Sequence, residues 1–548
     1  MSRTLPVLAL LTLVGCGKKE AAQGTTPSGG TAPSGALSIE VTEPEAAAFL
    51  PVGPVTVEGT QTGLSDLTLN GEPMDAADGT FSVGTEVIRG VNHFEARGEK
   101  GGTFRMVRRG VLAGSFADAS GPIDEAMGIR LNQGGLDAIG GLVGGLVDPA
   151  AISGSLAGAG PVYESVLVDL YVSSLWFSPL ELDFSPSPGE LAVDVVLPDV
   201  DITLLVDTAL GDFDAFVTAD EARIAGVITL GTDGQGHLSA GFTDAWVELD
   251  GLDLDTSLLP GDLTFGVEGL LQGTVEDLLQ EQVAGALPGL LEAQLSTLEL
   301  AFDLDLLGTA VSIASAFRGA SVDTDGVQIV ADLDVDVASN GTKIAPGFLS
   351  AGEIGRPVAD RSSDLGIALS DDLVNRLLHE VWTGGLIDLQ LTTEDGSLPS
   401  SYLEDFGTDE GTLQLDAKLP PVLVQNGDQA ELQIGELEMH LSTPTNSEFT
   451  YIDLALSGKI PVDLEVIGGE LKVSLGTPDI DFIVRDTDWG VDDDWLTELL
   501  EEKLPIADLI VVLGNFSFEL PEIAGISLGS AKIDRDDSGL FTTIGADL

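Results

Sequence analysis

The sequence predicts an α+β protein in which long antiparallel strands combine with a few helices, arranged as two copies of one plan behind a small β-sandwich. Apolar and polar residues alternate over long stretches, which is typical of strands with one buried face. Segments from the two halves of the chain resemble each other, which indicates an internal duplication. The chain has 548 residues and is 43% apolar, enough for about three or four domains.

The composition is strongly acidic. There are 90 Asp and Glu residues against 23 Lys and Arg residues, which gives a net charge of −67. Phosphate binding needs clustered basic side chains, so nucleic acid and anionic membrane surfaces are poor partners. The mean hydropathy of +0.25 nevertheless predicts a chain that buries a large core. The single cysteine, Cys16, excludes a disulfide within the chain and a cysteine metal cluster.

The first residues carry a secretion signal over residues 1–15. Arg3 precedes an apolar run that is too short to span a bilayer, and the run ends in Leu13-Val14-Gly15-Cys16. This motif resembles the lipobox of bacterial lipoproteins. The resemblance implies cleavage before Cys16 and attachment of acyl chains such as palmitate to it. Because Gly17 follows, it also implies an anchor in the outer membrane, with the protein facing the periplasm or the cell surface. The alternative is an ordinary signal peptide with a chance cysteine.

Residues 16–36 are rich in Gly, Ser, Thr, Ala and Pro and predict a flexible, lipid-anchored tether. Residues 37–114 show short alternating runs separated by Asn70-Gly71 and Asp78-Gly79, dipeptides that favour tight hairpins. This segment predicts a β-sandwich and resembles the bacterial immunoglobulin-like modules of secreted proteins. Such modules usually act as spacers, and a specific binding role is the alternative.

The two copies are predicted to span residues 115–345 and 346–548, and each begins with a strand followed by a helix. In the second copy Ser370 is a good N-cap, Asp371 and Asp372 favour the positive end of the helix, and Gly384-Gly385 ends it. The apolar helix faces are Leu136, Ile139, Val143 and Leu146 in the first copy, and Leu373, Leu377, Leu378, Val381 and Trp382 in the second.

Further helices are predicted at residues 267–295 and 495–504. Between the helices the apolar period is two: Val200, Ile202, Leu204 and Val206 alternate with mostly polar residues. Much of the negative charge therefore belongs to the solvent-exposed face of antiparallel strands. In the segment from residue 432 to residue 441 the phase slips by one at Gly435, which predicts a β-bulge in a curved sheet.

This plan resembles the tubular lipid-binding family, which includes the bactericidal/permeability-increasing and lipid-transfer proteins. The resemblance is clearest over residues 365–388 and at the C-terminus, residues 520–548. It implies two elongated, highly curved antiparallel β-barrels, each with long helices, joined end to end. The chain departs from the family in having no cysteine pair for the disulfide of animal members. At a net charge of −67 it also has no counterpart of the basic tip.

In the family, acyl chains lie between the opening helix of each barrel and its concave sheet. The resemblance therefore implies a ligand near both helix faces. The first site is predicted to be the roomier one, because Gly140, Gly141, Gly144 and Gly145 leave side-chain volume free. Close packing of the helix on the sheet is the alternative. The candidate ligand-binding residues are Leu136, Ile139, Gly140, Val143, Gly144, Leu146, Leu373, Leu377, Leu378, Val381 and Trp382.

Other chemistry has little support in the sequence. There are four histidines and no HExxH motif, and Gly525-Ile526-Ser527-Leu528-Gly529 lacks the downstream histidine that a hydrolase would need. Acidic turns such as the one at Asp323 lack a full calcium loop. We expect no enzyme, metal or cofactor. The expected function is an envelope-anchored lipoprotein that binds, and could transfer, phospholipid or another aliphatic ligand. The alternative is a non-lipid surface adhesion or scaffold protein with filled barrels.

Overall fold

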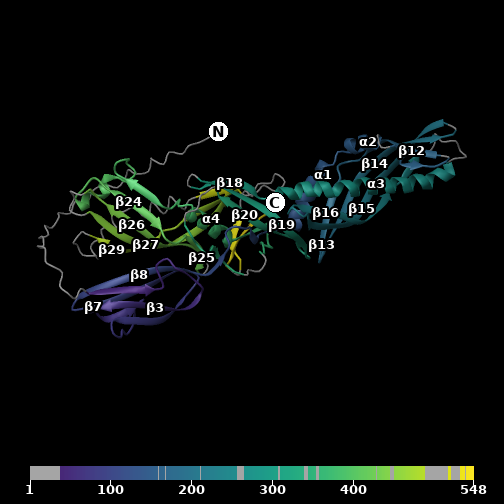
Figure 1. Ribbon diagram of the computed structural model, residues 1–548. Helices are drawn as coiled ribbons and strands as arrows, with labels where there is room; N and C mark the ends of the chain where they lie inside the picture. The colour runs from purple at the N-terminus through teal and green to yellow at the C-terminus, as the bar shows by residue number, and fades with distance from the viewer. Residues whose placement is uncertain are drawn as a thin grey trace.

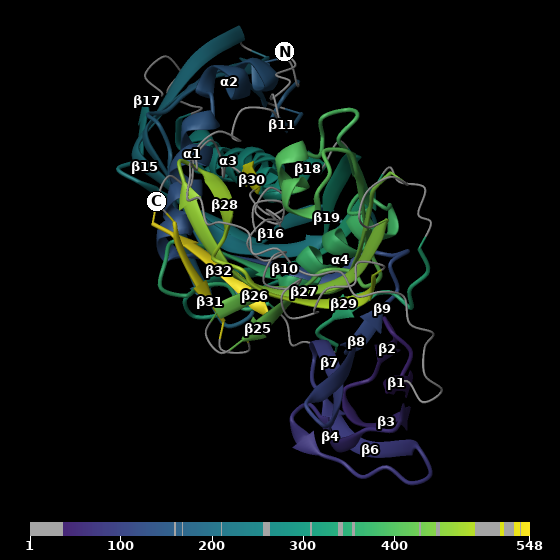
Figure 2. The same cartoon turned by 90° about the vertical axis from the view of Figure 1, so that its left-hand side faces the viewer.

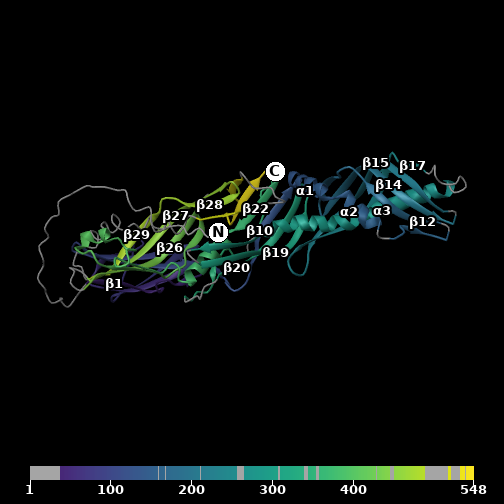
Figure 3. The ribbon, with the colours of Figure 1, turned by 90° about the horizontal axis from the view of Figure 1, so that it is seen from above.

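The computed structural model describes residues 37–157, 160–166, 168–209, 211–255, 264–306, 309–337, 343–352, 357–426, 429–444, 450–487, 516–519, 531–536 and 539–547. The predicted signal and tether with Cys16, the predicted helix at residues 495–504 and the motif at residues 525–529 lie outside these ranges. The molecule is elongated, with three large curved sheets following one another along its axis and a β-sandwich beside one end (Figures 1 and 3).

The sandwich module, residues 38–113, packs two sheets face to face around Val57, Phe81, Phe94 and Val111. As predicted, Asn70-Gly71 and Asp78-Gly79 adopt positive φ. One sheet contains β1 (Ser38–Glu43), β3 (Gly53–Thr62) and β6 (Thr80–Val87). The other contains β2 (Phe49–Leu50), β8 (Thr103–Ala113), β7 (Gly90–Lys100), β4 (Ser65–Leu69) and β5 (Glu72–Pro73).

The distal sheet is antiparallel and lies at the end of the molecule away from the sandwich module (Figure 1). Its strands show the predicted alternation, since Val200, Ile202, Leu204 and Val206 are all buried. Its strand order is β11 (Tyr163–Glu164), β12 (Val168–Trp176), β14 (Glu190–Thr208), β15 (Gly211–Thr232) and β16 (Leu238–Asp250), with β13 (Glu181–Ser187) beside β14 and β17 (Asp253–Asp255) beside β15. Its helices are α1 (Gln133–Leu146), α2 (Pro149–Ala157), α3 (Thr264–Leu295) and the short η1 (Ser296–Leu298).

The central sheet joins strands from distant parts of the chain. Its order is β18 (Ala301–Leu306), β19 (Thr309–Val322), β20 (Gly326–Val337), β10 (Ile123–Asn132), β22 (Leu365–Ser370), β32 (Phe541–Ala546) and β31 (Lys532–Arg535). Every pairing is antiparallel, and Ile129 at the middle of β10 lies opposite both Ile329 and Ile367. A small separate pair is formed by β9 (Ser115–Ala117) and β21 (Phe348–Ser350).

The third sheet lies beside the sandwich module and is strongly curved (Figure 2). Its order is β23 (Leu389–Thr392), β24 (Thr412–Ala417), β26 (Gln429–Ser442), β27 (Tyr451–Ile467), β28 (Glu470–Leu475) and β30 (Phe516–Glu519), with β25 (Val422–Asn426) beside β26 and β29 (Asp479–Thr487) beside β27. The remaining helices are α4 (Asp371–Thr383), η2 (Ser400–Tyr402) and η3 (Glu404–Phe406).

The N-terminus of α4 follows the sequence prediction closely. The Ser370 side chain accepts a hydrogen bond from the Asp372 N–H at 3.1 Å, and Gly384 caps the other end. The two first-turn carboxylates are buried but paired: Arg535 donates to both oxygens of Asp371 at 2.7 and 2.6 Å, and Ser350 donates to Asp372 at 2.8 Å. Because buried charges are costly unless paired, these contacts tie α4 to β31 and β21.

The predicted bulge in β26 is confirmed. Ile434 pairs with Gly458 and Leu437 with Leu456, so that two residues of β26, Gly435 and Glu436, lie opposite one residue of β27. Glu436 has a φ of 48°, and a Cβ added at Gly435 would lie 2.7 Å from a Val91 methyl carbon. The absence of a side chain at Gly435 thus allows the sandwich module to approach the bulge closely.

Hydrogen bonds reinforce this junction. The Val91 N–H donates to Gln433 Oε1 at 2.8 Å, the Gly110 N–H donates to the buried Glu436 carboxylate, and His93 Nε2 lies 2.8 Å from the Ser457 hydroxyl. The module, for which the family resemblance suggested a spacer role, is therefore packed firmly against the third sheet.

Acid should weaken this junction through His93. Burial, together with the charge of Arg108, lowers the His93 pKa from 6.5 to about 4. The imidazole of His93 therefore binds a proton more tightly in the unfolded chain than in the folded protein. Its contribution to the free energy of unfolding increases from about pH 4 to about pH 6.5 and is constant above pH 6.5. The loss at pH 4 is at most about 3 kcal/mol.

We expect His93→Gln to remove this part of the acid sensitivity, measured as the free energy of unfolding in urea at pH 7 and at pH 4.5. His237→Gln is the control: His237 is exposed, and its hydrogen bond to Glu299 raises its pKa, so losing it should not reduce the acid sensitivity. If His93→Gln loses as much stability as the wild type between the two pH values, this account of the junction is wrong.

Candidate functional site: an apolar slot beneath two helices

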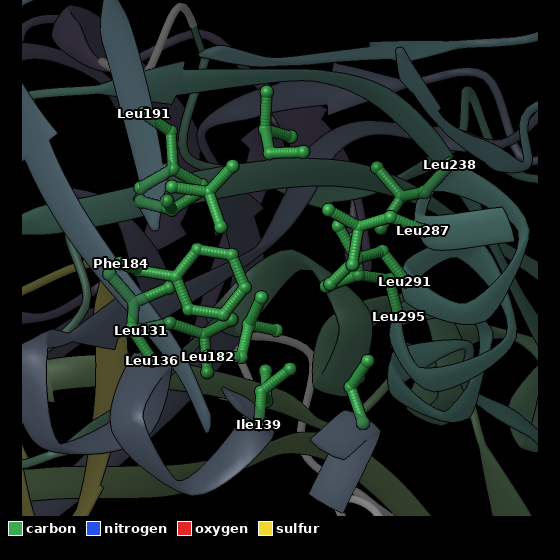
Figure 4. Packing of buried hydrophobic residues seen from close by; sticks show 14 of the residues in the cluster. Leu131, Leu136, Ile139, Leu182, Phe184, Leu191, Leu238, Leu287, Leu291 and Leu295 are labelled. Atoms are coloured by element: carbon green, nitrogen blue, oxygen red, sulfur yellow. The ribbon is translucent and has the colours of Figure 1, made fainter. Parts of the chain in front are cut away.

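An apolar slot lies where the distal sheet meets the central sheet (Figure 4). Helices α1 and α3 supply one wall each, and strands of both sheets supply the rest. The lining residues are Leu131 of β10, Leu136 and Ile139 of α1, Phe184 of β13, Leu191 of β14, Ile228 and Leu230 of β15, Leu291 and Leu295 of α3, and Val327 of β20.

The local sequence explains why these side chains meet. Helix α1 begins directly after β10 and packs on β13, so Leu136 and Ile139, three residues apart on one helix face, lie beside Leu131 of β10 and Phe184 of β13. Leu291 and Leu295, four residues apart, form the facing ridge of α3. Two residues predicted from the sequence, Leu136 and Ile139, therefore lie in the slot, while Leu291 and Leu295 belong to a helix that was predicted without a binding role.

The slot is apolar and narrow. All of its lining side chains are hydrocarbon, and the open space between them is about 20 Å³, room for roughly one water molecule. Most of the lining side chains are buried, with Leu291 at 3% and Leu295 at 5% exposure. A water molecule would find no polar partner here, whereas a hydrocarbon chain would find apolar contacts on every side.

The predicted role of the glycines in α1 is wrong. A Cβ added at Gly140 would lie 2.3 Å from the carbonyl oxygen of Leu182, and one at Gly144 would lie 2.6 Å from that of Leu180. These two glycines therefore allow the helix backbone to contact the chain at β13, and they leave no volume for a ligand. Gly141 and Gly145 face open space on the other side of α1. Close packing of the helix on the sheet, the alternative, explains Gly140 and Gly144 but not Gly141 and Gly145.

These contacts predict opposite effects for two neighbouring substitutions. Gly140→Ala should destabilise the protein by about 1–3 kcal/mol, because the new methyl group overlaps a backbone carbonyl. Gly141→Ala, the matched control, should stabilise it by up to about 1 kcal/mol, because alanine favours helix and nothing obstructs it. Thermal unfolding measures both. Equal shifts in the same direction would contradict the packing described here.

The remaining residues predicted in α1 do not line the slot. Val143 is fully buried within the core of the distal half, one turn beyond Ile139. Leu146 is 55% exposed, because it is the last residue of the helix and the chain leaves the sheet there. Contrary to the prediction from the sequence, Leu146 therefore does not share the buried face of Leu136, Ile139 and Val143.

The second predicted site is divided between two cores. Leu373 is buried, and Leu377 partly buried, in the cluster that also contains the slot residues. Val381 and Trp382 belong to the separate core of the third sheet, and Leu378 is partly exposed. Trp382 is held in place by its own bonds, since Nε1 donates to the Ala417 carbonyl at 2.6 Å and the ring lies 6.4 Å from that of Phe49 in the sandwich module.

The sequence analysis missed a buried polar group on α4. Arg376 and His379 are each 5% exposed, and Arg376 Nη1 lies 2.8 Å from Glu380 Oε1. Burial lowers the pKa of Arg376, and the charge of Glu380 opposes this shift. Neither ring nitrogen of His379 has a hydrogen-bond partner among the described residues. The spacing of Arg376, His379 and Glu380 on one helix face is the signal that could have revealed the group.

No described helix is long and apolar enough to cross a membrane. Within the described ranges, no group of three His, Cys, Asp or Glu side chains has an arrangement that could hold a metal ion. Asp323, considered above as a calcium ligand, instead accepts hydrogen bonds from Arg130 at 3.0 and 2.7 Å and from the N–H groups of its own turn.

Comparison with known proteins gives distant structural likenesses. No protein-family model matches the chain, and no curated protein sequence matches it. A crystal structure of a lipopolysaccharide binding protein aligns with 78% of this chain and 99% of its own, at 14% identity and a TM-score of 0.43. The structure of P47 of Clostridium botulinum E1 aligns with 78% of this chain and all of its own, at 7% identity and a TM-score of 0.28. Both likenesses are too distant to assign a function. The fold and the slot by themselves define an elongated protein of curved antiparallel sheets with an apolar internal site.

Proposed function

We propose that this protein is an envelope-anchored lipoprotein that binds phospholipid or another aliphatic ligand in the slot between α1, α3 and the curved sheets. The observation that carries the proposal is the slot itself: its lining is entirely apolar and is contributed by two helices and two sheets. No catalytic activity is proposed.

The chemistry of the slot favours a hydrocarbon chain. Each methylene group moved from water into apolar surroundings gains about 0.8 kcal/mol. A charged or hydroxylated group would lose its hydrogen bonds with water and gain none from the lining residues. The headgroup of a lipid would therefore stay outside, and only its acyl chain would enter.

Entry of a chain requires α3 to move, because the open space is only about 20 Å³. In the described part of the chain, Glu292 and Gln280 bond α3 to β16: Glu292 accepts from the Ala240 N–H at 2.9 Å, and Gln280 donates to the Ala245 carbonyl at 3.1 Å. Pro288 interrupts the hydrogen-bond ladder of α3 just before the slot residues Leu291 and Leu295. We therefore expect the part of α3 that follows Pro288 to move away from the sheets and open the slot as a lid.

The same plan in both halves would give a duplicated architecture of two barrels joined end to end. In support, β10 leads into α1 and β22 leads into α4, and these two strands are adjacent and antiparallel in the central sheet. Each also pairs on its other side with the late strand of its own half, β20 or β32. The apolar face of α4 is divided between two cores and does not line one common site. We therefore place the main ligand site in the slot beside α1 and α3.

Photo-crosslinking tests where the ligand lies. Full-length protein incubated with a fatty acid that carries a diazirine in its chain should be labelled on α1 and on the C-terminal part of α3. Ile139→Asp should lower the labelling by about tenfold, because it places a charge in the slot. Leu413→Asp, a similarly buried position in the core of the third sheet, is the control and should keep the labelled sites. Labelling confined to α4 or to exposed strands would refute the slot.

Loosening the lid should speed ligand uptake. In Gln280→Ala/Glu292→Ala both hydrogen bonds from α3 to β16 are lost, and we expect a fluorescent fatty acid to bind several-fold faster in stopped-flow measurements. Gln272→Ala is the control, because Gln272 donates to Glu276 within α3 and has no hydrogen bond to β16 among the described residues. Unchanged rates in the double variant, or the same acceleration in the control, would show that α3 is not the lid.

The anchor is tested independently by the intact mass of the protein purified from its native membrane. We expect a mature chain that begins at Cys16 and carries the added mass of acyl chains. A mature chain beginning elsewhere, or one without acyl mass, would contradict the lipobox interpretation.

A second candidate function is a non-lipid adhesion or scaffold protein. It is favoured by the small open volume of the slot and by the firm seating of the sandwich module on the bulge of β26. In that case no fatty acid would be incorporated at the slot, and α1 and α3 would remain unlabelled.

A further inference from the structure

A second cavity lies on the outer face of the distal sheet, on the opposite side from the lipid slot. It is a shallow hollow of about 390 Å³, within the range of small-molecule sites of roughly 300–1,000 Å³. Strands β13 to β16 supply its lining, and small residues including Ala192, Ala225 and Gly226 form part of it. The hollow exists because Ala192 and Ala225 carry almost no side-chain volume on the outer face, whereas a side chain at Gly226 would point toward Phe242 on the inner face.

A bulge shapes one side of the hollow. Ala225 of β15 pairs with Trp246 of β16, but Val227 pairs with Thr243, so β16 has one extra residue there. Asp244, within this extra segment, has a φ of 55° and lines the hollow together with Trp246. The bulge thus brings an indole ring and a carboxylate from the same strand to one cavity.

Trp246 is directed outward and is 48% exposed. Its neighbour Val247 packs against the core of the distal half, and alternation along the strand places Trp246 on the outer face. A large aromatic ring left this exposed beside a hollow offers its π face to a ligand, which is the usual way that tryptophan binds organic cations.

The ionisable side chains that line the hollow are acidic. Both lining residues that ionise, Asp194 and Asp244, are acidic, and no basic side chain lines the hollow. Asp194 is already paired, since Arg223 Nε lies 2.8 Å from each of its carboxylate oxygens. Asp244 has no ion pair in the described part of the chain. With a net charge of −67, the protein attracts cations and repels anions.

We propose that this hollow binds an alkylammonium group, held by the face of Trp246 and by the carboxylate of Asp244. Such a group occurs free in small amines and also in the headgroups of zwitterionic lipids. The site is independent of the lipid slot, because its residues lie on the other face of the sheet. A phosphate or carboxylate ligand would meet two acidic side chains and is not favoured.

Calorimetric titration of the full-length protein with tetramethylammonium chloride tests the proposal. We expect saturable binding, weakened at least about fivefold by Trp246→Ala and by Asp244→Asn, consistent with a cation–π contact of about 1 kcal/mol. Trp176→Ala is the matched control: Trp176 is 55% exposed in the same sheet and does not line the hollow. Circular dichroism confirms that each variant is folded.

Loss of affinity in Trp246→Ala and not in Trp176→Ala supports the site. The proposal is overturned if tetramethylammonium shows no saturable binding, or if the two tryptophan variants have equal effects. It is also overturned if the hollow binds methyl glucoside and not the cation. Glycerophosphocholine distinguishes the source of the group. If it binds as tightly as tetramethylammonium, the site accepts a lipid headgroup; if it fails to bind, the ligand is a free amine.

Discussion

The structure depends on the pairing of β10 with two partners. One edge of β10 bonds to β20 and the other to β22, with Ile129 opposite Ile329 on one side and Ile367 on the other. Residues far apart in the chain are thereby fixed in one ladder of backbone hydrogen bonds. A slip of one residue would turn every side chain of β10 to the opposite face, so the register is strongly determined. Because α1 and α4 follow β10 and β22 directly, the same register also positions both helices.

Each long strand of the distal half has one face in the apolar core and the other in contact with solvent. In β14, Val193 is buried in the core while the adjacent Asp194 faces outward and bonds to Arg223. This alternation explains how a chain with a net charge of −67 can be 43% apolar. Apolar side chains line the inside, where the apolar slot lies, and acidic residues cover the outside, where the hollow beside Trp246 lies. The two proposed sites therefore differ in ligand chemistry because they occupy opposite faces of one sheet.

Features set by local sequence could be predicted, and those set by distant contacts could not. The N-cap at Ser370, the alternation from Val200 to Val206 and the bulge at Gly435 depend on neighbouring residues, and the structure confirms all three. The role of Gly140 depends on β13, which is distant in sequence, so periodicity could not choose between a cavity and a close contact. Likewise, the phase slip at Gly435 predicted a bulge but gave no sign that the sandwich module packs on it.

The central claim is that the space enclosed by α1, α3 and the curved sheets takes up hydrocarbon chains. Organic-solvent extraction of the native full-length protein, followed by mass spectrometry, tests it most directly. The proposed acyl chains on Cys16 would be covalent and would stay with the polypeptide, so the extract would report only lipid bound non-covalently. The account predicts near-stoichiometric phospholipid or fatty acid in the extract. An extract without lipid, from protein that also fails to take up added fatty acid, would contradict it.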